Sequence, residues 1–167
     1  LSYLGSDDLF TDPNKTTKQV LAMRSTGAEW SYFTGEGSYI PKLRFFNKLC
    51  ERSHLLRLYM LFWRNPINSS SIMIRASSYQ AFGGWKHWSG NADCDGALVL
   101  LYSFLRLKLV VVRGNPVMYR KHDGQAISAA DYQSRFKGTR NRIFSELQSE
   151  GMSALGIALG RFMTWLR

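Results

Sequence analysis

Two adjacent carboxylates near the start of the chain carry the clearest chemical signal. Asp7 and Asp8 follow the apolar residues 1–4 and the turn residues Gly5 and Ser6. Neighbouring carboxylates repel each other, a local cost that folded chains accept where a cation or several hydrogen-bond donors compensate. Mg²⁺ takes few protein carboxylates and completes its octahedron with phosphate oxygens and water. The pair fits a cation site, and it also fits an ordinary acidic turn, because aspartate is common in turns.

A second group combines two glycines with an aromatic ring. Gly83 and Gly84 directly precede Trp85. Paired glycines stop a helix because they accept left-handed backbone angles, and an indole offers a large apolar face for packing or for binding. The tripeptide therefore predicts a helix stop followed by an aromatic residue that anchors the loop, lines a binding site, or does both.

Charge restricts the possible partners. The net charge is +10 over 167 residues, which favours an anionic partner such as nucleic acid, an anionic membrane face or a phosphorylated substrate. A nucleic-acid-binding protein would carry a recognisable module or a compact basic stripe interleaved with aromatic residues. The sequence has neither, so no nucleic acid is expected.

Cysteine usage and hydropathy indicate the compartment. Cys50 and Cys94 have neither metal-ligand nor redox spacing, which predicts a reducing environment. No apolar run is long enough to span a membrane, and no signal peptide opens the chain. We expect a cytoplasmic protein.

The elements that must position these residues alternate between strand and helix, which predicts an α/β fold. The first half reads as a strand at 1–4, a short helix at 16–23, a strand-like stretch at 29–39 and a basic amphipathic helix at 43–63. That last helix either packs one face on the core or docks on an anionic membrane.

The second half continues the alternation and then becomes helical. The pattern predicts a strand at 69–75, a helix at 77–82, a helix at 93–107, a strand at 109–113, an extended piece at 116–120, and helix from 131 onward with a break at Gly151. We expect residues 1–130 to form the main α/β portion and residues 131–167 a helical extension.

Four ordered segments resemble the family 2 glycosyltransferases of the GT-A fold. Residues 3–10, with Pro13 and residues 18–20, are similar to the strand, Asp-x-Asp-Asp loop and helix of that family, and residues 65–75, with Tyr79 and residues 82–85, look like its acceptor-side segment. Residues 92–95 are similar to its Glu-Asp motif, and residues 118–128 to its Tyr-Arg-x-His segment ending in Ile-Ser. The resemblance implies a GT-A-like, Rossmann-related mixed sheet flanked by helices.

On the donor side, the resemblance implies that Asp7 is a ligand of Mg²⁺ or Mn²⁺ and helps to hold the donor diphosphate, with Asp8 beside it. His122 would reach the metal or the diphosphate, and Arg120 would neutralise phosphate charge. By composition alone His122 fits equally well in a solvated basic loop. The first Asp of the family's loop is Gly5 here, which removes one expected contact with the nucleotide.

On the acceptor side, the resemblance implies that Asp93 is the general base that takes the proton of the acceptor hydroxyl. Ala92 stands where the family has Glu. Asp95 either compensates or serves as a first-turn acid of a helix. The glycines 83 and 84 and Trp85 would line the acceptor site.

The implied reaction is metal-dependent, inverting and non-processive transfer of a sugar from a nucleotide-sugar donor to a glycan or lipid-linked acceptor. Such an enzyme would build surface polysaccharide or glycoconjugate and could lie peripherally on the inner face of an anionic membrane. The family's nucleotide-binding half has no counterpart in these residues, so we expect the donor pocket to be incomplete and the isolated chain to be inactive. The alternative is a noncatalytic, degenerate transferase fragment whose basic surface binds anionic membrane or nucleic acid.

Overall fold

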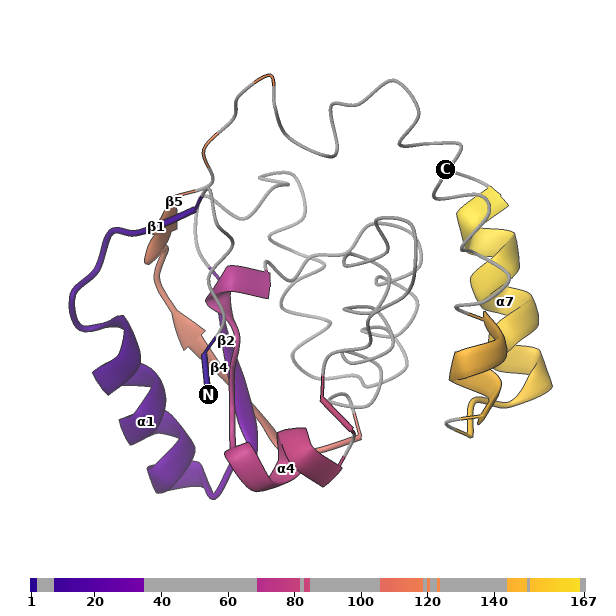
Figure 1. Cartoon of the computed structure of the whole chain (residues 1–167), viewed down its shortest axis with the longest axis horizontal. Helices are drawn as coiled ribbons and strands as arrows, with labels where there is room; N and C mark the ends of the chain where they lie inside the picture. The colour runs from indigo at the N-terminus through magenta and orange to yellow at the C-terminus, as the bar shows by residue number, and fades with distance from the viewer. Residues whose placement is uncertain are drawn as a thin grey trace.

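A computed structural model describes residues 1–2, 8–34, 69–81, 83–84, 106–118, 120, 123, 144–149 and 151–165. In chain order, the elements with defined bounds are β1 (Leu9–Phe10), α1 (Lys15–Thr26), β2 (Trp30–Thr34), the 3₁₀ helix η2 (Ser69–Ser71), β3 (Met73–Ile74), α4 (Ala76–Ala81), β4 (Leu109–Arg113), β5 (Val117–Met118) and α7 (Ala154–Trp165). Figure 1 shows their arrangement, with α1 and α7 on opposite sides of the molecule. The protein is a small mixed α/β protein.

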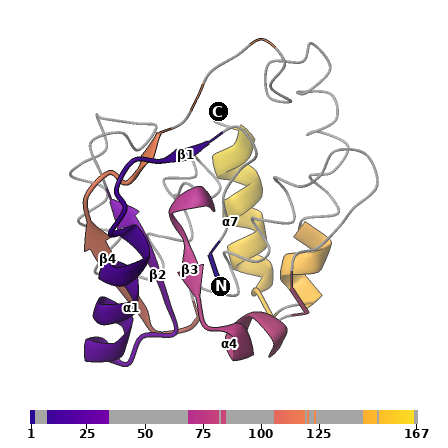
Figure 2. The same ribbon diagram turned by 60° about the vertical axis from the view of Figure 1, so that its left-hand side comes forward.

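A three-stranded mixed sheet forms the centre of the described part. β2 pairs in parallel with β4, from Trp30 opposite Leu109 to Thr34 opposite Arg113. β3 runs antiparallel on the other side of β2, giving the order β3-β2-β4, as Figure 2 shows. A bridge from Ser2 to Met73 places the start of the chain beside β3.

Helix α1 covers one face of this sheet, as Figure 2 shows. It begins after a turn in which Asp12 Oδ1 accepts a hydrogen bond from the Asn14 amide at 2.8 Å. It ends at Gly27, whose left-handed φ of 68° is a conformation that glycine adopts without strain. A buried apolar cluster lies between them, formed by Met23 of α1, Ala28 of the connection to β2 and Met73 of β3, with the partly buried Val20 and Val110 packed against it.

A second sheet of two strands pairs β1, which precedes α1, with β5, which follows β4. β1 and β5 are antiparallel, with Leu9 opposite Met118 and Phe10 opposite Val117. The Thr11 amide extends the pairing by donating to the Pro116 carbonyl at 2.8 Å. Segments more than a hundred residues apart in the sequence are therefore neighbours here.

The C-terminal region is helical. Residues 144–149 form a helix, a turn at Gly151 with φ of 91° follows, and α7 completes the pair. Phe144, Leu147, Met152 and Ile157 are buried here. None of the helices in the described ranges combines the length and apolar character needed to cross a membrane.

Several sequence predictions are confirmed and others need correction. The strand at 109–113, the extended piece at 116–120 and the break at Gly151 are confirmed, the second over its two strand residues. The helix predicted at 77–82 forms one residue earlier, and the helix predicted at 16–23 extends to Thr26 because Gly27, not Met23, supplies the cap.

The prediction of a continuous strand at 69–75 is wrong. The three serines form the 3₁₀ turn η2 and only Met73 and Ile74 pair as strand. At 93–107, the two described residues, Arg106 and Leu107, lie in a turn rather than a helix. The helix predicted at 43–63 lies outside the described residues, and the division into 1–130 and 131–167 stays a prediction.

Candidate functional site

Asp8 is a buried carboxylate with one oxygen left without a partner. Its exposed fraction is 7%. Oδ2 accepts a hydrogen bond from Ser70 Oγ at 2.5 Å, whereas Oδ1 is buried and has no hydrogen-bond partner in the described part of the chain. An unpaired buried carboxylate oxygen is energetically costly, and such atoms in folded proteins commonly bind an ion, a ligand or a water molecule.

The other carboxylates with defined contacts in the described segments differ from Asp8. Asp12 accepts hydrogen bonds from Lys18 Nζ at 2.6 Å and from a backbone amide, and these lower the pKa of its carboxyl, the Lys18 bond most. Glu29 accepts from Ser78 Oγ at 3.2 Å and from the Lys108 amide at 3.2 Å. Both are engaged by the protein itself, so Asp8 stands apart by its free oxygen.

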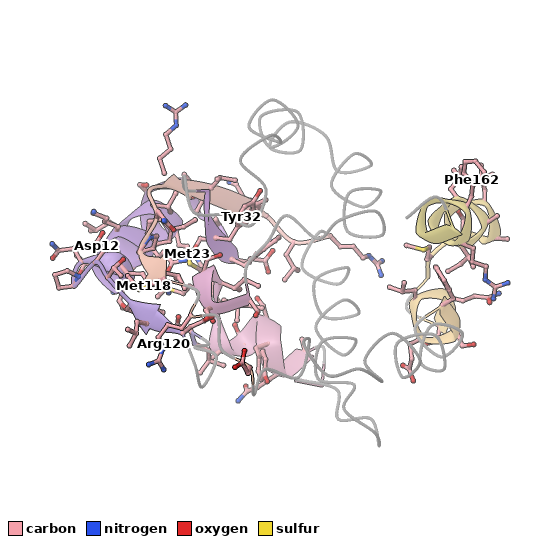
Figure 3. All side chains as sticks on the ribbon, turned by 90° about the horizontal axis from the view of Figure 1, so that it is seen from above. Asp12, Met23, Tyr32, Met118, Arg120 and Phe162 are labelled. Atoms are coloured by element: carbon pink, nitrogen blue, oxygen red, sulfur yellow. The ribbon has the colours of Figure 1, made fainter. Side chains whose placement is uncertain are left out.

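The β1·β5 pairing brings Asp8, which belongs to the acidic segment of residues 7–8, to the same end of a sheet as the basic residue Arg120. Asp8 immediately precedes Leu9, and Arg120 follows Met118 by two residues. Because Leu9 lies opposite Met118 in an antiparallel ladder, Asp8 and Arg120 lie beyond the same end of that ladder. Figure 3 shows Met118 and the exposed Arg120 on the same side of the molecule. Two predicted donor-side segments therefore meet.

The hydrogen bond from Ser70 to Asp8 brings in a third segment. Ser70 lies in η2, within the stretch that resembles the acceptor side, and it is fully buried. The bond spans 62 residues of sequence. It fixes the Asp8 side chain from the side of η2, so the orientation of the free oxygen is set by the fold.

Lys15 of α1 is a buried charged residue that the sequence did not mark as part of a site, and it contacts Ser2 and Phe10, on either side of the acidic segment. Only 1% of the residue is exposed. Its ammonium donates to Ser2 Oγ and to Gln19 Oε1, each at 3.0 Å, and lies 4.4 Å from the centroid of the Phe10 ring. Burial lowers the pKa of Lys15 from 10.5 to about 8.

Gln19 anchors Lys15 to the sheet and to η2. The Gln19 side chain is fully buried. Its Nε2 donates to Ser31 Oγ at 3.0 Å and to the Ser71 carbonyl at 2.9 Å, while its Oε1 accepts from Lys15. Every polar atom of this amide has a partner, so the network is fully satisfied and rigid.

A sequence signal for this network existed. Lys15, Gln19 and Met23 recur at intervals of four, and all three are buried on the face of α1 that meets the sheet. Two polar residues in line with a core methionine indicate a buried polar network. The usual surface preference of lysine and glutamine hides that signal.

The paired glycines confirm the predicted helix stop. Gly83 and Gly84 have φ of 74° and 73°, and their amides donate to the carbonyls of Gln80 and Tyr79 at 2.9 and 3.1 Å. A Cβ on Gly84 would lie 3.2 Å from the Tyr79 ring. Their acceptor role stays a prediction.

Five predicted site residues, Asp7, Trp85, Asp93, Asp95 and His122, lie outside the described residues, and their roles stay predictions. No group of three or more His, Cys, Asp or Glu side chains able to hold a metal occurs among the described residues. A hard cation that also binds phosphate oxygens and water needs only one or two carboxylates, so the Asp8 carboxylate fits Mg²⁺ or Mn²⁺ as one of its protein ligands.

No family model matches the chain, and neither a curated protein nor a solved structure matches it. The residues and their geometry therefore carry the functional conclusion.

Proposed function

We propose that the protein is a family 2-like, nucleotide-sugar-dependent glycosyltransferase of the GT-A fold. It transfers a sugar to an acceptor hydroxyl with inversion and in single additions, and serves surface polysaccharide or glycoconjugate synthesis. The observation that carries the proposal is the unpartnered, buried Oδ1 of Asp8. Asp8 accepts a hydrogen bond from Ser70 and lies beyond the same end of the β1·β5 ladder as Arg120. These three residues belong to three different segments of the resemblance.

The electrostatics of this site support an anionic donor held through a cation. Asp8 offers a fixed negative oxygen, and Arg120 extends from the same end of the β1·β5 ladder as an exposed positive charge. Mg²⁺ or Mn²⁺ together with a diphosphate would complement both, because Asp8 would help to hold the cation and the Arg120 guanidinium would pair with phosphate oxygens. Asp7 and His122 are the further proposed ligands.

The proposed chemistry follows from these roles. Asp93 takes the proton of the acceptor hydroxyl as its oxygen attacks the anomeric carbon, and the bond to the donor diphosphate breaks. Arg120 stabilises the negative charge that the diphosphate gains. Bound Mg²⁺ or Mn²⁺ supplies further charge neutralisation on the leaving oxygens. Gly83, Gly84, Trp85 and Asp95 hold the acceptor.

The architecture supports the same proposal at a coarser level. A mixed sheet with a parallel pair, β2 and β4, requires a crossover connection, as α/β nucleotide-binding folds use. The candidate site lies at one end of the separate two-stranded sheet, where Asp8 precedes β1 and Arg120 follows β5.

The test is Mn²⁺-dependent release of nucleotide from a panel of UDP-, GDP- and dTDP-sugars by the complete protein, with and without added glycan or lipid-linked acceptors. We expect activity that chelation abolishes and that Asp8→Asn and Asp93→Asn remove without loss of folding. Asp12→Asn is the matched control, because Asp12 is only partly buried and both of its carboxylate oxygens have protein partners, Lys18 and the Asn14 amide. Full activity in Asp93→Asn or Asp8→Asn would contradict the proposal.

The second candidate is a noncatalytic transferase remnant that binds an anionic membrane or nucleic acid, and α7 favours its membrane form. Leu155 and Phe162, seven residues apart on one helix face, are 70% and 53% exposed. The sequence after Glu150 contains two arginines and no acidic residue. An apolar face with basic flanks suits the interface of an anionic bilayer.

Vesicles of mixed phosphatidylserine and phosphatidylcholine separate the two candidates. Salt-sensitive binding that Leu155→Ser with Phe162→Ser removes, together with absence of sugar-nucleotide turnover, would support the remnant. Salt-sensitive binding to DNA instead would indicate its nucleic-acid form. Turnover that both apolar substitutions leave intact would support the enzyme.

A further inference from the structure

Lys15 contacts both flanks of the acidic segment. Ser2 precedes Asp7 and Asp8 in the chain, and Phe10 follows them. One ammonium donates to Ser2 Oγ at 3.0 Å and lies 4.4 Å from the Phe10 ring centroid. We propose that Lys15 is a positioning residue that fixes the two flanks of the acidic segment and so sets the orientation in which Asp8 takes a divalent cation.

A buried lysine is an expensive choice for a purely structural clamp. Within the described residues its ammonium forms no ion pair, and its partners are the neutral hydroxyl of Ser2, the neutral amide of Gln19 and the Phe10 ring. A methionine would fill a similar volume without the desolvation cost. Local choices that work against stability are concentrated at functional sites.

The three contacts suit an ammonium in particular. An ammonium has three tetrahedrally arranged N–H donors, and here two reach oxygens and the cation faces the aromatic ring. No apolar side chain can hold Ser2 and Phe10 in this way. The lowered pKa agrees with the tight enclosure of the group.

The same network reaches Asp8 from its other side. Gln19 receives the Lys15 hydrogen bond and donates to the carbonyl of Ser71, whose neighbour Ser70 donates to Asp8. The flanks of the acidic segment and the Asp8 side chain are thus tied to one turn, η2. Partners that orient a ligand commonly change metal affinity when they are replaced.

This inference rests on the proposed function only in naming a divalent cation as the ligand of Asp8; the anchoring can be measured without any ligand. Two backbone amides report it. The Ile74 amide donates to the Leu1 carbonyl beside Ser2 at 2.9 Å, and the Thr11 amide follows Phe10 and donates to the Pro116 carbonyl at 2.8 Å. Hydrogen exchange at these amides reads the two flanks separately.

The experiment compares Lys15→Met with Lys18→Met, a control on the same helix whose ammonium is exposed and pairs with Asp12. Amide exchange, the melting temperature and the Mn²⁺ dissociation constant by electron paramagnetic resonance are measured on the complete protein. In Lys15→Met we expect faster exchange at both amides and about tenfold weaker Mn²⁺ binding at a similar melting temperature. Lys18→Met should match the wild type in all three.

The outcomes separate the two proposals. Faster exchange in Lys15→Met in a protein that binds no Mn²⁺ even as wild type would support the anchoring and defeat the cation site. Unchanged protection at Ile74 and Thr11, or unchanged Mn²⁺ affinity despite faster exchange, would overturn the positioning role. If Lys15→Met does not fold, Ser2→Ala removes the hydroxyl of an exposed residue, which accepts from Lys15 and also donates to the Ile72 carbonyl at 3.1 Å. Ser2→Ala should speed exchange at Ile74 but not at Thr11, and it should weaken Mn²⁺ binding by a smaller factor than Lys15→Met. No change in Mn²⁺ affinity would overturn the proposal.

Discussion

The region around α1 and the C-terminal helices bury opposite kinds of side chain. Between α1, β2 and η2 the buried side chains are polar or charged: Lys15, Gln19, Ser31, Ser70, Ser71 and Asp8. In the helices at 144–149 and 154–165 and the turn that joins them, the buried side chains include Phe144, Leu147, Met152 and Ile157, and Leu155 and Phe162 are exposed. The first region uses burial to fix directional contacts, whereas the second uses it for apolar stabilisation.

The difference matters because polar and apolar burial have different consequences. Apolar contacts are non-directional and tolerate exchange between side chains of similar volume. A satisfied hydrogen-bond network specifies one arrangement, and losing one partner strands the others. A site that must hold Asp8 in one orientation needs the second kind. Substitutions in the C-terminal helices should therefore change stability alone, and substitutions in the buried polar network between α1 and η2 should change Mn²⁺ binding too.

The largest expected effect is Phe144→Ala. Phe144 is 1% exposed, and the Arg161 guanidinium lies 5.3 Å from its ring centroid. Removing the ring leaves a cavity and ends the cation–π contact, so the free energy of unfolding should fall by about 4 kcal/mol in denaturant titration. Mn²⁺ affinity should stay within about twofold of the wild type. A loss of Mn²⁺ binding in the folded variant would break the distinction between the regions.

Gln19→Leu should lower the free energy of unfolding slightly less than Phe144→Ala does, but it should also weaken Mn²⁺ binding. Leucine fills similar volume yet leaves a Lys15 N–H, the Ser31 hydroxyl and the Ser71 carbonyl without the amide, which costs about 3 kcal/mol. Gln80→Leu, at an exposed position of α4, is the control and should change stability by less than about 0.5 kcal/mol. Equal stability of the two variants in urea titration would show that the network contributes nothing.

The pH dependence of stability isolates Lys15. Its pKa is about 8 when folded and 10.5 in its ordinary environment, so between these values the unfolded chain binds more protons than the folded one. Stability from this group therefore rises with pH, by about 2 kcal/mol from pH 7 to pH 9.5. Lys15→Met removes this rise, which the difference between wild-type and variant urea titrations measures. A difference that does not change with pH would contradict the burial of a charged amine.

Lys15→Met should itself change stability little at pH 7. The substitution relieves roughly 3 kcal/mol of desolvation, as the change in pKa implies. It also leaves the buried Gln19 Oε1 without its donor, which costs about 1 to 3 kcal/mol. The two effects nearly offset, which is why this variant suits the test of positioning.

Local sequence patterns predicted the elements whose causes are local. The β-branched run at 109–113 forms β4 as expected, and the glycines at 83, 84 and 151 take the left-handed angles that end helices or turn the chain. The three serines of η2 were misread as strand, because serine hydroxyls and neighbouring carbonyls allow a tight turn as readily as a ladder.

The candidate site was predictable only in part. The acidic pair marked Asp8 as chemically interesting, yet its burial and its bond to Ser70 depend on contacts between distant segments, and its position at the same ladder end as Arg120 depends on the pairing of β1 with β5 across more than a hundred residues. No local pattern contains such a pairing, and β1 itself was not predicted. Lys15 was missed because a lysine in a helix is ordinarily solvated.

The most direct test of the central claim is binding of Mn²⁺ to wild type and Asp8→Asn, followed by electron paramagnetic resonance on the complete protein. The substitution keeps the shape and an acceptor for Ser70 but removes the charge behind the free oxygen. We predict saturable binding in the wild type and in Asp12→Asn, and at least about tenfold weaker binding in Asp8→Asn. Equal affinity in Asp8→Asn and the wild type would contradict the account.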